Sequence, residues 1–206
     1  MARDIKPIPT IYKGVTFKSR LEAQWAVFWD ELGVKWEYEP QPFKFSDGKQ
    51  YTPDFWIVDL RLWVEIKPNA KIAHEEKAEW KCSQLAYETG NLVYLDQSGM
   101  TWHTEEYCEY SGFLIPPGSW IYSVLFLYCR VGVLQEDYIF ESENHYWATC
   151  SNCGKIGISM SASSSIPIQG LNQNIFSCEC DTHPRWLDSY SEIVMKAYDK
   201  ARRYWS

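Results

Sequence analysis

Two carboxylates and a lysine are spaced in a way that suits the hydrolysis of a phosphodiester bond. Asp54 follows Pro53, and Glu65 and Lys67 lie eleven and thirteen positions further along the chain. Carboxylate oxygens are hard ligands for Mg²⁺, which neutralises charge on a phosphate and lowers the pKa of a bound water. Lys67 would orient or deprotonate the attacking water, or stabilise the negative charge that develops. The backbone carbonyl of Ile66 is a further candidate ligand.

Neighbouring strands are predicted to carry these residues. Extended segments are expected over Lys35–Phe45, Gln50–Leu60 and Arg61–Lys67. A turn signal separates the first two segments, so the three predict an antiparallel meander. Alternation along the third segment places Glu65 and Lys67 on one face of the sheet and its aliphatic side chains on the other.

Helices are predicted on either side of these strands. Ser19 and Glu22 form a capping-box pattern, and apolar side chains then recur at helical spacing until Gly33. A second helix is expected over about Ala73–Thr89, closed by a glycine and followed by a short apolar strand at Leu92–Leu95. The order helix, three strands, helix and strand predicts an α/β core.

Three short motifs occur in order along this core. They are Tyr38-Glu39-Pro40-Gln41-Pro42-Phe43, Tyr51-Thr52-Pro53-Asp54-Phe55 and Val64-Glu65-Ile66-Lys67-Pro68. With them, the segment from about Tyr12 to Asp96 resembles the PD-(D/E)xK nuclease core. It is similar in particular to the TnsA-type transposase endonuclease domain and to small phage-encoded nucleases. The resemblance implies a restriction-endonuclease-like αβββαβ core with a mixed central sheet.

The same resemblance implies an activity and a set of site residues. The activity is that of a Mg²⁺- or Mn²⁺-dependent DNA endonuclease, encoded by a phage or mobile element, that leaves a 5′-phosphate. Asp54 and Glu65 would be metal ligands, and Lys67 the catalytic lysine. Glu22, on the first helix, matches the further acidic residue that completes the metal site in many members of the class. Its alternative role is to close the capping box with Ser19.

The second predicted helix carries a partial match to another motif. Gln84 and Tyr87 resemble the Gln-x-x-x-Tyr motif of RecB-type nucleases, which contacts DNA near the metals, but their spacing is three instead of four. Gln84 is therefore a candidate neighbour of the active site, and Tyr87 is expected in the core. Lys71 and His74 are expected at solvated loop positions, with phosphate contact as the alternative.

A second candidate metal site lies in the other half of the chain. Of the seven cysteines, four form two close pairs, Cys150 with Cys153 and Cys178 with Cys180. Four thiolates would hold a structural Zn²⁺ in tetrahedral geometry, as in a zinc ribbon. In one alternative, His183 is a ligand in place of one cysteine. In the other, the thiols bind no metal. The remaining cysteines are expected to be buried thiols: Cys82, Cys108 and Cys129.

The chain is predicted to divide into a nuclease core, a small zinc-ribbon-like insertion and a C-terminal helix that packs on the core. The expected bounds are 1–112, 113–183 and 184–206. The terminal helix is expected over Ser189–Trp205, and its basic side chains are candidates for phosphate contact, with a solvated face as the alternative. Few basic residues flank the cysteines, so the insertion is expected to contact a protein or to give structural support.

Charge and hydropathy limit the partners. The formal net charge of −7 argues against wholesale nonspecific binding to nucleic acid. Residues 1–100 hold 13 of the 20 basic but only 15 of the 27 acidic side chains, so any nucleic-acid face is expected in the first half. The longest apolar stretch, Trp120 to Leu134, contains Arg130 and is too short for a membrane span. It is expected to be a buried strand or helix.

DNA endonuclease action is the leading hypothesis, with DNA as the expected partner. The alternative is a catalytically silent nuclease-fold protein that binds another protein through its zinc-bearing half. Nuclease action on RNA or branched DNA is a third hypothesis, because surrounding loops read the shape of a substrate. The first residues lack the pattern of a signal peptide, so a cytoplasmic protein is expected, in the bacterial host if phage encoded. The oligomeric state is open, a dimer included.

Overall fold

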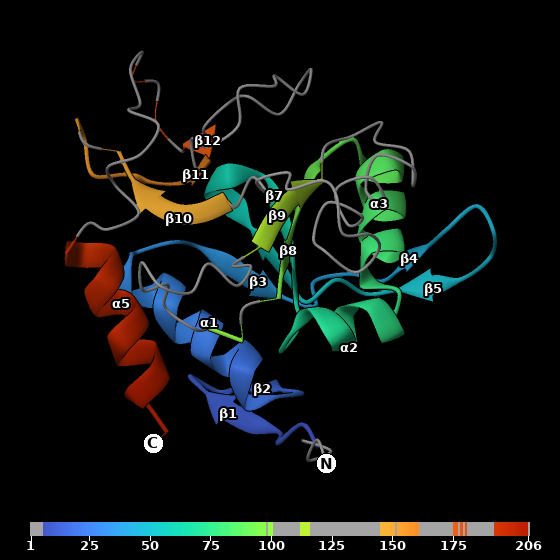
Figure 1. Ribbon diagram of the computed structural model, residues 1–206, viewed down its shortest axis with the longest axis horizontal. Coiled ribbons are helices and arrows are strands. Elements are labelled where there is room, and N and C mark those ends of the chain that lie inside the picture. The colour runs from blue at the N-terminus through green and yellow to red at the C-terminus, as the bar shows by residue number, and fades with distance from the viewer. Residues whose placement is uncertain are drawn as a thin grey trace, which may run out of the picture.

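The computed structural model describes residues 6–97, 99–100, 112–115, 145–150, 152–160, 175–176, 178, 180 and 192–205. These form a mixed α/β structure with a five-stranded sheet at its centre (Figure 1). None of the helices within these ranges is both long and apolar enough to cross a membrane. The predicted stretch from Trp120 to Leu134 lies outside the described residues, as do Cys108, Cys129 and His183.

The central sheet is mixed, as predicted. Its strands stand in the order β3 (Trp36–Tyr38), β6 (Phe55–Ile57), β7 (Leu62–Ile66), β8 (Leu92–Asp96) and β9 (Gly112–Ile115). Only β7 and β8 run parallel, and every other neighbouring pair is antiparallel. The helical connection between β7 and β8 is what a parallel pair requires, because a short turn cannot join parallel strands.

Strand β7 is buried on both of its faces. Leu62, Val64 and Ile66 belong to a core cluster shared with α1 (Arg20–Glu31), whereas Trp63 belongs to a second cluster shared with α3 (Ala78–Thr89). The predicted alternation of the strand is therefore confirmed. Helices cover both faces of the sheet, so a charged side chain in the middle of β7 is shielded from water.

Helix α1 is the centre of the first cluster. Ser19 caps it, as predicted, by accepting a hydrogen bond from the backbone N–H of Glu22. Its aromatic stripe is covered by the C-terminal helix α5 (Glu192–Arg203), with the rings of Phe28 and Tyr198 only 4.4 Å apart between centroids. The two helices also share a hydrogen bond between the Gln24 side chain and a backbone carbonyl of α5.

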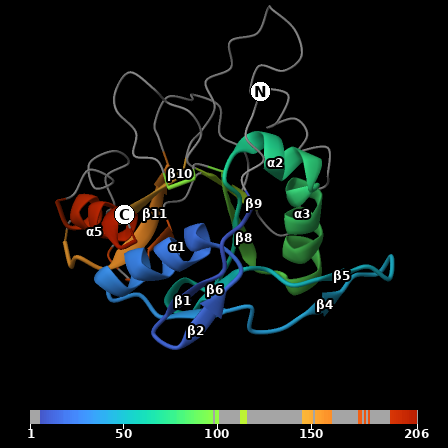
Figure 2. The same cartoon turned by 90° about the horizontal axis from the view of Figure 1, so that it is seen from below.

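The first two predicted strands are each broken in two, so the expectation of continuous strands is wrong there. The four pieces are β3 and β4 (Phe43–Lys44), then β5 (Gln50–Tyr51) and β6. Prolines lie at both breaks, and they cannot donate to a strand ladder: Pro40, Pro42 and Pro53. Strands β4 and β5 pair with each other as a separate hairpin that projects beyond the sheet (Figures 1 and 2).

The second predicted helix is also broken. Helix α2 (Ala70–Glu75) ends before α3 begins, and between them Lys77 has a left-handed φ of 55°. Helix α3 ends at Gly90, whose φ of 66° matches the predicted glycine cap. Lys71 and His74 are exposed on α2, so the expectation of loop positions for them is wrong.

Besides the β4–β5 hairpin, two smaller sheets flank the centre. A hairpin of β1 (Thr10–Tyr12) and β2 (Val15–Phe17) precedes α1 and was not predicted from the sequence. The other sheet has the order β10 (His145–Thr149), β11 (Ile156–Met160) and β12 (Ile175–Phe176), and all of its pairs are antiparallel. The paired cysteines lie in the turn between β10 and β11 and just beyond β12.

Candidate functional site

Asp54 lies at the edge of the central sheet, immediately before β6. Phe55 of β6 stands opposite Val64 of β7, so the same antiparallel pairing continued by one residue places Asp54 opposite Glu65. The Oδ2 atom of Asp54 accepts a hydrogen bond of 2.8 Å from the backbone N–H of Ile66. Like charges directly opposite each other destabilise a sheet. Either a proton or a bound cation would relieve this repulsion between the carboxylates.

Glu65 is almost completely buried, with 3% of its surface exposed. Its Oε2 atom accepts a hydrogen bond of 2.6 Å from the hydroxyl of Tyr51, and its Oε1 atom lies 2.9 Å from the ammonium of Lys67. The Tyr51 hydroxyl also lies 3.9 Å from the buried thiol of Cys82 on α3. A buried charge is tolerated only when it is paired and hydrogen-bonded, and both conditions hold here.

Lys67 follows β7 and is bound by two carboxylates. Its ammonium lies 2.9 Å from Glu65 and 2.7 Å from Glu76, and its side chain is 14% exposed. Burial lowers the pKa of Lys67, but the negative charges of Glu65 and Asp54 and the hydrogen bonds to its partners raise that pKa further. The net pKa is above the ordinary lysine value, so Lys67 is a cation at neutral pH.

Glu22 contacts both the cap of α1 and the residues beside the end of β3. Its Oε1 atom accepts a hydrogen bond of 2.6 Å from the Ser19 hydroxyl, within the cap of α1. Its Oε2 atom accepts one of 2.5 Å from the Tyr38 hydroxyl and one of 3.2 Å from the backbone N–H of Lys18. A full capping box would use the N–H of Ser19 instead. The cap thus fixes the Glu22 carboxylate beside the sheet edge that carries Asp54.

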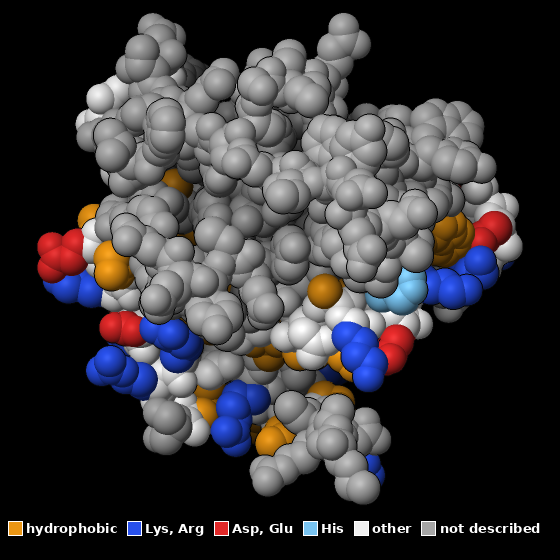
Figure 3. Space-filling model, viewed as in Figure 1, with side chains coloured by type: hydrophobic (Ala, Val, Ile, Leu, Met, Phe, Trp, Pro, Cys, Tyr) orange, Lys and Arg blue, Asp and Glu red, His pale blue; other side chains and the backbone are white. Residues whose placement is uncertain are grey.

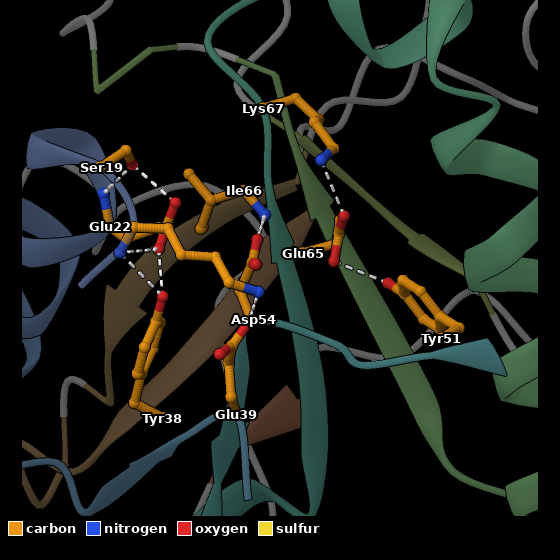
Figure 4. Close-up of polar contacts among 10 residues, drawn as sticks. Ser19, Glu22, Tyr38, Glu39, Tyr51, Asp54, Glu65, Ile66 and Lys67 are labelled. Carbon is orange, nitrogen blue, oxygen red and sulfur yellow. Dashed lines mark hydrogen bonds and ion pairs between the residues drawn. The ribbon is translucent and has the colours of Figure 1, made fainter. Parts of the chain in front are cut away.

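Figure 4 shows Asp54 between Glu22 and Glu65, with Lys67 directed toward Glu65. Burial raises the pKa of Asp54 well above its usual range, and the negative charges of Glu65 and then Glu22 raise it further. The charge of Lys67 and the Ile66 hydrogen bond offset only part of this effect. Asp54 is therefore the residue at which the site most needs an additional positive charge.

The three carboxylates do not close around one point. Within the described ranges, only the cysteines form a group of three or more His, Cys, Asp or Glu side chains whose ligand atoms all lie within 4.8 Å of one another. Glu22 and Glu65 instead stand on two sides of Asp54. A cation at this site would be held by Asp54 together with one or both neighbours.

Gln84 is not brought to these carboxylates. It is half-buried on α3, two residues after Cys82, which contacts Tyr51 beside Glu65. Two residues turn an α-helix by about 200°, so Gln84 points away from that contact. Tyr87 is 62% exposed, and the expectation that it lies in the core is therefore wrong.

The basic side chains of α5 are largely paired with acidic ones. The ion pairs join Lys196 to Glu192, Lys200 to Glu31, and both Arg202 and Arg203 to Asp199, at 2.5 to 3.7 Å. Figure 3 accordingly shows acidic side chains among the basic ones on this part of the surface. The solvated-face interpretation of α5 is the one that these ion pairs favour.

The four predicted zinc ligands do come together. Cys150, Cys153, Cys178 and Cys180 place their sulfur atoms within 4.8 Å of one another, and they form no disulfide. The turn between the first two is fixed by a hydrogen bond of 2.7 Å from Gly154 N–H to the Cys150 carbonyl. Gly154 has a φ of 72°, which favours glycine. The cluster could hold a metal ion.

The thiol of Cys150 has a lowered pKa. Burial raises the pKa of this thiol, but hydrogen bonds from the backbone N–H groups of Cys153 and Asn152, together with those from the Cys178 and Cys153 thiols, lower the pKa to about 6. The thiolate, which is the form that binds a metal, therefore predominates at neutral pH. The fifth described cysteine, Cys82, is a buried thiol outside the cluster, as predicted.

The cysteine turn is tied to the layer that contains α1. Trp147, on β10, is only 1% exposed, and it lies three residues before Cys150. Its ring centroid lies 5.6 to 6.4 Å from four aromatic rings of the core: Trp25, Phe28, Trp29 and Tyr94. The cysteine cluster thus lies at the end of a hairpin whose Trp147 indole is part of the main core.

Several residues of the site were not singled out from the sequence. The side chains of Tyr38, Tyr51 and Glu76 contact Glu22, Glu65 and Lys67, respectively. The backbone N–H of Lys18 donates to Glu22, and the Lys18 ammonium forms an ion pair with Glu39. Tyr38, Glu39 and Tyr51 lie within the quoted motifs, so their position was a usable signal. Lys18 and Glu76 carry no such signal, because their contacts depend on how α1 and α2 pack against the sheet.

We expect Tyr51→Phe to lower the free energy of unfolding by about 1.5–3 kcal/mol, the usual range for a hydrogen bond to a charged group. The substitution leaves the Glu65 carboxylate buried without its phenolic donor. Urea unfolding would measure the change. Tyr38→Phe is the matched control, because Tyr38 is half-buried and water can replace its hydroxyl. Equal effects of the two substitutions would contradict the importance of burial at Glu65.

Comparison with known proteins gives no family for this chain. No protein-family model, curated protein or solved structure matches it. Function therefore has to be inferred from the geometry and charge of the site.

Proposed function

We propose that the protein is a Mg²⁺- or Mn²⁺-dependent endonuclease that hydrolyses phosphodiester bonds in DNA. The observation that carries the proposal is the position of Asp54 between Glu22 and Glu65 (Figure 4). Burial, then the charges of Glu65 and Glu22, raise the pKa of Asp54. A divalent cation would replace the proton that this crowding favours and would relieve the repulsion. Oxygen ligands of this kind suit Mg²⁺ and Mn²⁺.

The charge of the whole centre supports the same conclusion. Five carboxylates and two ammonium groups are joined by the contacts described above, which leaves an excess of three negative charges when all are ionised: Glu22, Glu39, Asp54, Glu65 and Glu76 against Lys18 and Lys67. A phosphodiester is itself an anion, so it could not approach this edge of the sheet unless cations first balanced the excess.

The roles of the side chains follow from their positions. Asp54 and Glu65 would hold the metal ion from adjacent strands, and Glu22 would approach it from α1. When bound, the ion would polarise the scissile phosphate and lower the pKa of a water molecule. Lys67 is protonated, so it would stabilise developing negative charge and orient the water and would not act as the general base. The Ile66 carbonyl remains a predicted ligand.

DNA is proposed as the substrate because of the three motifs that resemble PD-(D/E)xK nucleases. The deciding experiment is a cleavage assay with Mg²⁺ or Mn²⁺ over single-stranded, duplex and branched DNA and RNA. We expect cleavage of at least one DNA substrate by the parent protein and none by Lys67→Ala. Cleavage of RNA alone would change the substrate. A protein that cuts nothing, yet binds a protein partner equally well after Asp54→Ala, would be the silent binding module.

We also propose that the ion of the cysteine cluster is Zn²⁺ and that its role is structural. Four thiolates close a tetrahedral site and leave no open position for a substrate or a water molecule. Because Trp147 is buried in the core three residues before Cys150, such an ion would stabilise the packing of the β10–β11 hairpin on the core.

A further inference from the structure

A second lysine reaches the carboxylates from the outer side of the sheet. The backbone N–H of Lys18 lies 3.2 Å from Glu22 Oε2 and 3.1 Å from the Tyr38 hydroxyl. Its ammonium forms an ion pair with Glu39. Glu39 follows β3, and β3 lies on the side of β6 opposite to β7. Asp54 is therefore flanked by one lysine–glutamate pair on each side.

Glu39 is held in place by the sheet. Tyr38 stands opposite Phe55, so the same pairing places Glu39 opposite Asp54, and the Glu39 N–H donates a hydrogen bond of 2.9 Å to the Asp54 carbonyl. Glu39 also has a φ of 43°, a left-handed conformation that residues other than glycine seldom adopt. Such conformations persist where the surrounding structure enforces them, and they are common at functional sites.

The two lysines differ in their exposure. The side chain of Lys18 is 68% exposed, whereas that of Lys67 is 14% exposed. The carboxylates of the site nevertheless act on Lys18. Its pKa is raised first by the hydrogen bond to Glu39 and also by the charges of Asp54 and Glu22. The buried ammonium of Lys67 is suited to contact the phosphate that is cleaved. The exposed ammonium of Lys18 is suited to contact a phosphate that is bound but not cleaved.

We propose that Lys18 binds a backbone phosphate of the nucleic-acid strand, next to the phosphate that is cleaved. Glu39 is then a positioning residue: its carboxylate holds the ammonium in the free protein and is exchanged for the substrate phosphate on binding. This inference rests on the proposed nuclease function, because it places a nucleic-acid strand across the sheet edge at Asp54. Glu39 and the substrate phosphate then compete for the Lys18 ammonium.

Affinity for a short fluorescein-labelled DNA duplex, measured by anisotropy with Ca²⁺ in place of Mg²⁺, separates these roles. We expect Lys18→Ala to weaken binding by on the order of threefold to tenfold and to reduce the salt slope by about 1. Glu39→Gln is expected to tighten binding by a similar factor, because it frees the Lys18 ammonium and removes a negative charge beside the phosphate.

Lys13→Ala is the matched control. Lys13 pairs with Asp30 at 2.8 Å, and the exposures of this pair, 64% and 19%, are close to the 68% and 23% of Lys18 and Glu39. Asp30 lies near the other end of α1, eight residues or about 12 Å along the helix from Glu22. Lys13→Ala is therefore expected to bind the duplex as the parent does.

The possible results distinguish this inference from the nuclease function. If the parent cuts DNA but Lys18→Ala and Lys13→Ala bind it equally well, the phosphate contact is refuted and the nuclease is not. Weaker binding by Glu39→Gln would also refute it, because a merely structural carboxylate gives that sign. If the parent shows the expected binding pattern but cuts nothing, the nuclease is refuted and the phosphate contact stands. A parent that binds neither duplex nor single strand refutes both.

Discussion

Asp54→Asn is expected to abolish cleavage and, at the same time, to make the metal-free protein more stable. Asparagine has nearly the same size and can still accept the hydrogen bond from Ile66 N–H. It carries no charge, so it binds a divalent cation poorly but is not repelled by Glu65 and Glu22. We expect a loss of rate on the order of 10³-fold or more and a gain in the free energy of unfolding of about 0.5–2 kcal/mol.

The raised pKa of Asp54 also predicts how the stability of the metal-free protein changes with pH. The pKa of Asp54 is higher in the folded protein than in the unfolded chain, where it is about 4. The protonated carboxyl therefore contributes stability that is fully present below pH 4 and is lost as the pH rises through the folded pKa. Thermal unfolding without metal should show this loss in the parent but not in Asp54→Asn. Mg²⁺ should restore stability to the parent at neutral pH.

Asp59→Asn is the control for this prediction. Asp59 is exposed on the short helical turn Val58–Leu60, in the connection between β6 and β7, so its substitution removes the same charge outside the site. Its cleavage rate and Mg²⁺ response are expected to equal those of the parent. If Asp54→Asn cuts DNA at the parent rate, or if Mg²⁺ stabilises it as much as the parent, the assignment of the metal site is wrong.

Cys150→Ser is expected to lose the bound metal and to loosen the main core. The parent should contain one zinc ion per chain by elemental analysis, and the variant less than a tenth of that. Structural zinc binding is coupled to folding, so its loss should lower the free energy of unfolding by on the order of several kcal/mol. Because Trp147 is anchored three residues before Cys150, its indole should become more exposed and tryptophan emission should shift to longer wavelength.

Cys82→Ser separates metal loss from the loss of a buried thiol. Cys82 is fully buried beside Tyr51 and lies outside the cysteine cluster. Its substitution is expected to reduce stability and to leave the zinc content unchanged. Retention of zinc by Cys150→Ser, or a parent protein that contains no zinc when prepared without chelators, would rule out the structural zinc site.

Local patterns predicted the elements that depend on local interactions. The cap at Ser19, the apolar spacing of α1 and the alternation of β7 are properties of a few consecutive residues, and all three are confirmed. The break at Lys77 was not predictable, because no glycine or proline marks its left-handed conformation.

The residues of the site likewise fall into those that a local pattern predicted and those that it did not. Asp54, Glu65 and Lys67 lie at the adjoining ends of β6 and β7, so the predicted pairing of these strands, together with the three motifs, indicated that they lie close together. Glu22 approaches from a helix, and its assignment came from the resemblance. The ion pair between Lys18 and Glu39 joins the segment before α1 to the end of β3, and no local pattern reports such a contact.

The covering of α1 has a consequence for how the chain folds during its synthesis. Trp147 and Tyr198, which close the aromatic stripe of α1, are made long after the helix itself, and the hydrogen bond from Gln24 to α5 spans 178 positions. Contacts between such distant segments slow folding and prolong the exposure of apolar surface. A nascent chain that has released only α1 and the central strands therefore presents an uncovered tryptophan-rich face, and ribosome-bound intermediates should be substrates for chaperones until α5 emerges.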